Sequence, residues 1–125
     1  MASSDNGAMT FDWTSGALAE GLRCYRGGEF FEAHEHWECV WLGCEELEKT
    51  FLQSLIQVSA AFHHLQRGNA AGAISLLTRA LGRLERYPAE FAGVAVEPLR
   101  RSIRAWLTSL AAESPQPQPV YPHIG

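Results

Sequence analysis

The sequence of 125 residues lacks a long apolar segment, since no run approaches the ~20 residues that a membrane-spanning helix needs. Its first residues also lack a basic region followed by an apolar one, so we expect no secretory signal. The three cysteines are an odd number and form no C-x-x-C pair, which argues against a disulfide framework and favours a reducing environment. These absences predict a cytoplasmic protein that does not bind membranes.

Charge is distributed unevenly over the chain. Residues 1–66 contain three Lys or Arg and ten Asp or Glu, a net charge of -7, whereas residues 67–125 contain seven and four, a net charge of +3. The acidic total of -4 argues against general nucleic-acid binding, which needs a concentrated basic surface. Halves of opposite charge can attract each other within one chain or between copies, so a homo-oligomer is one hypothesis.

Apolar residues recur at helical spacing, and Gly, Asn and Pro mark the expected helix ends. The expected helices cover residues 15–28, 29–43, 49–66, 70–86 and 97–112. The helix at 49–66 is apolar on almost all sides and should therefore lie at the centre. Gly68 should end this helix, and Asn69 should cap the next one. No alternating apolar and polar pattern predicts a strand.

A weak internal repeat indicates two helical hairpins. The segment GEFFEAHEHW begins at Gly28 and GNAAGAISLL begins at Gly68, and Ala33 and Ala73 match at the same offset of 40 residues. The layout is similar to that of tetratricopeptide-type repeats. We therefore predict an all-α, single-domain bundle of about five helices over residues 13–112. It should contain two tetratricopeptide-like hairpins and a closing C-terminal helix.

The two ends of the chain differ in composition from this domain. Residues 1–12 are predicted to form a flexible tail, and residues 113–125 contain four of the six prolines. Such a Pro-rich segment cannot be helical and favours polyproline II. It is either an ordered or frayed end, or a strap that docks on the bundle or on a partner through Val120, Tyr121 and Ile124.

The stretch EFFEAHEHWECVW, residues 29–41, is the part of the sequence that indicates chemistry. Each residue of a helix turns by about 100°, which places His34 and Glu38 inside a stripe of Phe and Trp side chains. A buried carboxylate without a partner is costly, so we expect Glu38 to contact His34, one turn earlier on the same face.

The central helix can complete a polar group with this pair. Gln57 and His64 lie along one of its edges, where Ala60 leaves room, and His63 is the alternative to His64. Glu35 lies on the flank of the second helix. We therefore predict a polar cluster between the second and third helices that consists of His34, Glu35, Glu38, Gln57 and His64.

Three roles are open for this cluster. It can be a structural network that sets helix register, a metal site of His34, Glu38 and His64, or an acid/base site without a metal. The segment His34–Glu38 reads H-E-x-x-E, one residue from the H-E-x-x-H zinc signature. Binding of a ligand or protein partner in the groove beside the second helix is the leading function. A protein with a divalent metal cofactor, or a metal-dependent hydrolase, is the alternative.

A basic stripe on the fourth expected helix is a separate feature. Arg79, Arg83 and Arg86 lie opposite the leucines of that helix. Such a stripe is typical of a solvated face, and the alternative is a surface for an anion or an acidic partner.

The segments RGGEFFEAHEHWECVW and FLQSLIQVSAAFHHLQRGNAAGAISLL resemble the bacterial and archaeal family called domain of unknown function 309 (DUF309) over roughly residues 20–85. The chain has Ser54 where members commonly have Gly. The resemblance implies a small all-helical bundle and supplies no established reaction, substrate or cofactor. It adds weight to one shared site for His34, Glu38, Gln57 and His64. The family pattern falls on Phe30, Phe31, Glu32, His34, Glu35, Trp37, Glu38, Leu55, Ile56, Gln57, His63, His64, Arg67, Gly68, Asn69, Gly72 and Ala73.

Overall fold

The helices follow the order that the sequence predicts. The computed structural model describes residues 11–112 and 118–124 of the chain. The predicted all-α fold is confirmed, and the helix ends differ from the predicted ones by up to three residues. In the described part of the chain, none of the helices is long and apolar enough to cross a membrane. The helices are α1 (Gly16–Arg26), α2 (Phe30–Trp41), α3 (Glu46–Gln66), α4 (Ala70–Leu84) and α5 (Val96–Ala111).

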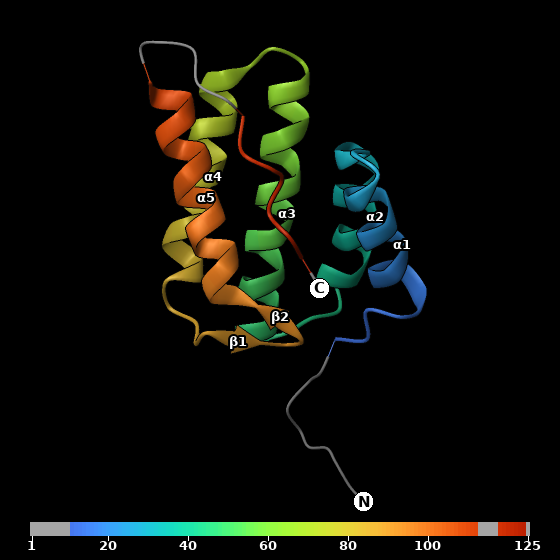
Figure 1. The fold of residues 1–125 in the computed structure, drawn as a ribbon. Coiled ribbons are helices and arrows are strands. Elements are labelled where there is room, and N and C mark those ends of the chain that lie inside the picture. Colours follow the sequence, from blue (N-terminus) through green and yellow to red (C-terminus); the bar gives the residue numbers. More distant parts are fainter. Residues whose placement is uncertain (1–10, 113–117, 125) are drawn as a thin grey trace, which may run out of the picture.

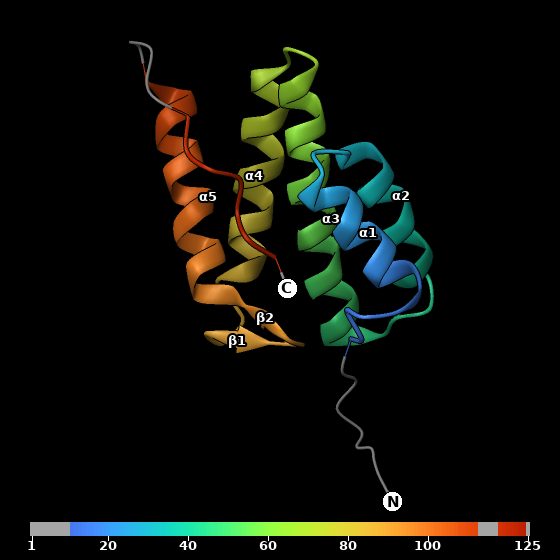
Figure 2. The same cartoon turned by 45° about the vertical axis from the view of Figure 1, so that its right-hand side comes forward.

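Helix α3 is the centre of the fold. It packs on α2 along one side and on α4 along another (Figures 1 and 2). Its apolar side chains point in most directions and most of them are buried, which requires other elements on several sides of the helix. Helix α1 covers α2, and α5 packs on α4. The predicted central position of this helix is therefore confirmed.

Both helical hairpins turn at a glycine. Gly28 follows α1 and Gly68 follows α3, and their φ angles are 78° and 79°. In each turn the residue after the glycine donates its amide to the carbonyl five residues earlier, at 2.8 Å. Glycine suits this left-handed conformation because it has no Cβ atom. Asn69 then caps α4, as predicted, by accepting a hydrogen bond from Gly72 N at 2.9 Å.

Helix α1 approaches α2 closely because Gly21 leaves room for the ring of Trp37. The Trp37 side chain is completely buried, and its Nε1 atom donates to the carbonyl of Leu18 at 3.2 Å. A Cβ atom at position 21 would overlap this indole ring. The contact between α1 and α2 therefore depends on a glycine at this position.

A short hairpin connects α4 to α5. Strands β1 (Glu90–Phe91) and β2 (Val94–Ala95) pair in antiparallel fashion. The sequence pattern does not predict these strands, because strands of two residues are too short to show an alternation of apolar and polar residues. Between them, Ala92 and Gly93 have φ angles of 52° and 82°, as a type I′ turn requires.

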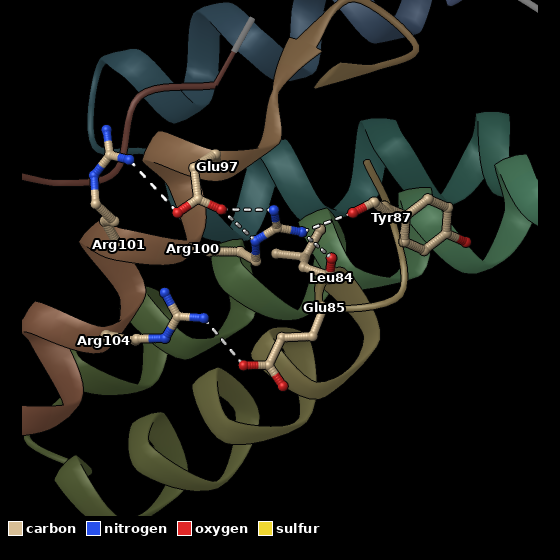
Figure 3. A network of polar contacts seen from close by, with 7 residues as sticks. All are labelled: Leu84, Glu85, Tyr87, Glu97, Arg100, Arg101 and Arg104. Carbon is tan, nitrogen blue, oxygen red and sulfur yellow. Dashed lines mark hydrogen bonds and ion pairs between the residues drawn. The ribbon is translucent and has the colours of Figure 1, made fainter. Parts of the chain in front are cut away.

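Arg100 of α5 caps the end of α4 (Figure 3). Its guanidinium group donates to the carbonyls of Leu84 and Tyr87 at 2.7 and 2.8 Å, and to the carboxylate of Glu97 at 2.6 Å. The Arg100 side chain is only 12% exposed, so these hydrogen bonds form largely away from water. The last carbonyls of a helix lack hydrogen-bond donors within the helix and carry partial negative charge. Arg100 supplies both the donors and a positive charge.

Residues 118–124 form a strap that runs back along the bundle (Figures 1 and 2). The Ile124 side chain is buried, and the rings of Tyr121 and Trp106 stack with centroids 5.5 Å apart. Val120 is 84% exposed, and only its carbonyl takes part, as the acceptor for Trp106 Nε1 at 2.9 Å. Of the two alternatives for this tail, the docked strap is the one observed, without the side chain of Val120.

The strap also reaches α1. The Tyr25 hydroxyl donates to the carbonyl of Pro122 at 2.6 Å, and burial raises the pKa of Tyr25 well above its usual value. At the other end of the chain, Phe11 is buried in the core. Residues 1–10 and 113–117 lie outside the described residues. The division into a domain at 13–112 and two tails therefore stays a prediction.

We expect Gly21→Ala to lower the free energy of unfolding by about 1–3 kcal/mol, because Trp37 must move to admit the added methyl group. Gly82→Ala in α4 is the matched control. A Cβ atom there meets no heavy atom within 4 Å, so it should stabilise the helix by about 0.5–1 kcal/mol. Urea unfolding followed by circular dichroism measures both effects. Equal effects of the two changes would contradict the packing described for Trp37.

Glu97 gives the fold a defined pH dependence. The hydrogen bond from Arg100 holds the pKa of Glu97 below its ordinary value of 4.5. A carboxylate with a lowered pKa in the folded state stabilises above the unfolded pKa, and this stabilisation is lost as the pH falls through the folded pKa. Glu97→Gln should therefore destabilise the protein at neutral pH, and the difference from the wild type should shrink in acid. Urea unfolding over a pH series tests this expectation, with the exposed Glu90→Gln as the control; a difference independent of pH contradicts it.

Candidate functional site

A buried hydrogen bond sets the register between α2 and α3. The Ser59 hydroxyl of α3 donates to the carbonyl of Phe30, the first residue of α2, at 2.7 Å. The two helices run in opposite directions, so later residues of α2 lie beside earlier residues of α3 (Figure 1). His34 of α2 and Ala60 of α3 line the same cavity. We call this line of contact, from Phe31 and His63 at one end to Trp41 and Lys49 at the other, the α2–α3 seam.

His34 and Glu38 make the contact that the sequence predicts. The Nε2 atom of His34 lies 3.3 Å from the Oε2 atom of Glu38, one helical turn away. The His34 side chain is 25% exposed and that of Glu38 is 53% exposed. The expected burial of Glu38 is therefore wrong. The helix buries Phe30, Ala33 and Trp37, which leaves Glu38 at the open edge of the seam.

A cavity of about 280 Å³ opens at the His34 end of the seam. The Phe31 ring lies 5.8 Å from the His34 ring and 5.2 Å from the His63 ring, measured between centroids. The structure therefore places His63 and His64 together at this cavity, although the sequence treated them as alternatives. Its lining consists of Phe31, His34, Ala60, His63 and His64.

The other predicted residues are less closely joined to this group. The Nδ1 atom of His64 lies 3.2 Å from Nδ2 of Asn69, so this ring is oriented by the cap of α4. Gln57 is buried in α3, one turn before Ala60. Glu35 is exposed, and no hydrogen bond or ion pair involves its side chain within the residues that the structure describes. Nor do three His, Cys, Asp or Glu side chains in these ranges come together as metal ligands.

Three buried polar atoms along the seam lack hydrogen-bond partners among the described residues. They are Nδ1 of His34, Nε1 of Trp41 and Oε1 of Gln57. His34 and Trp41 are two turns apart on one face of α2, and Gln57 lies on the facing side of α3. A buried polar atom without a partner costs roughly 1–3 kcal/mol. The seam therefore carries hydrogen-bonding capacity that no described residue uses.

Sequence reasoning did not assign Phe31 and Trp41 to the site. Both belong to the stripe of Phe and Trp side chains that surrounds His34 and Glu38 on the helical wheel. A signal was present, since helical geometry places Trp41 on the same face as His34. Phe31 is exposed at the mouth of the cavity, and Trp41 is half-buried at the far end of the seam. An aromatic residue beside a polar pair can therefore belong to a site, and periodicity alone does not separate the two cases.

Comparisons with known proteins agree with the fold and assign no activity. Residues 18–76 match the model of a family described as domain of unknown function (DUF309). A crystal structure of a conserved hypothetical protein, TTHA0068 from Thermus thermophilus, is similar at 32% sequence identity and a TM-score of 0.64. The similarity covers 80% of this chain and 99% of that chain. No curated protein matches the chain.

We expect Glu38→Ala to change the free energy of unfolding by less than about 0.5 kcal/mol, because its contact with His34 is a half-exposed pair within one helix. Ser59→Ala is the comparison, and it should cost about 1 kcal/mol or more because its hydrogen bond is buried. Chemical denaturation of the two variants measures the difference. If Glu38→Ala proved the more damaging change, the pair would be part of the structural network.

Proposed function

Because the chain belongs to the DUF309 family, whose description assigns no activity, we propose a function from the site itself: the protein binds a small ligand in the cavity at the His34 end of the seam. The ligand is largely apolar and carries one hydrogen-bond donor. The observation that carries the proposal is the different surroundings of the two ring nitrogens of His34. One ring nitrogen of His34 lies beside Glu38, the other is buried without a partner in the described chain, and the His34 side chain lines the cavity.

The contact with Glu38 supports one tautomer of His34. A carboxylate can only accept a hydrogen bond, so its position beside Nε2 favours a proton on that nitrogen. In the neutral ring, Nδ1 is then an acceptor. A ligand with an N–H or O–H group can supply the missing donor, and Glu38 would keep the imidazole in the orientation that receives it.

The rest of the cavity supports an apolar body for the ligand. Phe31 and Ala60 offer carbon surfaces, and the rings of His63 and Phe31 lie close together at the wall. A volume of about 280 Å³ suits a ligand of one or two rings. The same orientation of His34 would also allow Nδ1 to accept a proton from a bound ligand, as in an acid/base site.

Phenol and anisole are matched probes for this proposal, because they share one ring and only phenol can donate. We expect phenol to bind about tenfold more tightly than anisole, since only phenol satisfies Nδ1 of His34. Titrations followed by the imidazole ¹⁵N signals of the wild type measure both affinities. In His34→Gln the preference for phenol should be lost. In His36→Gln, a change on the opposite side of α2, it should remain.

The outcomes of this experiment separate the alternatives. Absence of binding by both probes would contradict the proposed function, and equal binding by both would contradict the role of Nδ1. The metal hypothesis for His34, Glu38 and His64 predicts a different result. Untagged protein would bind Zn²⁺ saturably, a chelator would lower its melting temperature, and Glu38→Ala would lose the ion.

A further inference from the structure

A second cavity lies at the opposite end of the α2–α3 seam. It has a volume of about 450 Å³ and is formed by the end of α2, the first turns of α3 and the last turn of α4. None of its lining residues belongs to the cavity at His34. The lining consists of Trp41, Glu46, Lys49, Thr50, Gln53 and Arg83.

Two cations, Lys49 and Arg83, line this cavity. Arg23, Arg100, Arg101 and Arg104 each form an ion pair with a glutamate. Within the described ranges, no ion pair involves Lys49 or Arg83, and both side chains are half-buried. Glu46 also lines the cavity, but it is exposed, so water screens its charge more strongly. The formal charge of these three groups is +1.

Lys49 is held in place by the Trp41 ring. Its Nζ atom lies 4.3 Å from the ring centroid, a distance at which the ammonium group is attracted to the aromatic face. The indole Nε1 of Trp41 is buried and has no acceptor among the described residues. Lys49 and Arg83 thus bring cationic donors from two helices to one cavity beside the Trp41 side chain, and Gln53 adds an amide.

We propose that this cavity binds a small oxyanion, a carboxylate or a phosphate group. Such a group has several acceptor lone pairs and a negative charge, and it can receive hydrogen bonds from Arg83 and Lys49 together, beside the Trp41 ring. Arg83 belongs to the basic stripe of α4, so one member of that stripe contributes to a site. The proposal does not rest on the proposed function at His34, since the two cavities share no residue.

Nuclear magnetic resonance can follow this site through the indole N–H signal of Trp41. The chain has four tryptophans, and Trp41→Phe identifies the signal by its loss. Sodium phosphate and sodium acetate are titrated separately at constant ionic strength, with chloride as the balancing anion. We expect one of the two anions, or both, to shift the Trp41 signal saturably. The anion that binds more tightly shows whether the cavity prefers a phosphate or a carboxylate group.

Arg83→Gln should weaken this binding by about tenfold or more, because it removes a charge-assisted donor. Lys49→Met is a second variant with the same expected direction, and circular dichroism checks that each is folded. Arg101→Gln is the matched control, since it removes the same charge from an exposed position on α5 and should leave the affinity unchanged. The proposal is wrong if neither anion gives a saturable shift at Trp41, or if Arg83→Gln and Lys49→Met bind as well as Arg101→Gln.

Discussion

The hydrogen bond from Ser59 to the carbonyl of Phe30 is the constraint on which both cavities depend. It joins two helices at residues that are 29 positions apart and lies in the core, where water cannot replace it. Phe30 itself is completely buried, with its ring packed on Tyr25, Phe62 and Tyr121. Once this point is fixed, the rise of a helix determines which residues face each other further along. The contact fixes where α2 begins beside α3, and both cavities are lined by residues of these two helices.

The sequence predicted the helices well, but it predicted the burial of individual side chains less well. Apolar periodicity and the turns at Gly28 and Gly68 were sufficient to predict the order of the elements. The placement of Glu38 on the same face of the helix as His34 was also predictable, because the regular turn of a helix fixes which residues share a face. Its exposure was not predictable, because burial depends on how far a neighbouring helix extends over that side chain. Likewise, composition indicated that the last segment could dock, but only packing decides that Ile124 is buried and Val120 is not.

The two ends of the α2–α3 seam differ in chemistry because different helices complete them. At one end, α3 contributes His63 and His64, and the cavity is lined by aromatic and imidazole rings. At the other end, α4 approaches and adds Arg83, so that cationic groups predominate. The basic second half of the chain thus supplies Arg83 to the cationic end of the seam. Trp41 of α2 and Arg83 of α4 line the same cavity beside the first turns of α3.

Docking of the strap has a consequence for the order in which the chain folds. The hydrogen bond between Tyr25 and Pro122 joins residues that are 97 positions apart, whereas the two helical hairpins join close neighbours. The entropic cost of closing a loop rises with its length, and distant contacts slow folding. Attachment of the strap to α1 should therefore be a late step. Neither cavity is lined by a residue of the strap, which is linked to the α2–α3 seam through the packing of Tyr121 on Phe30.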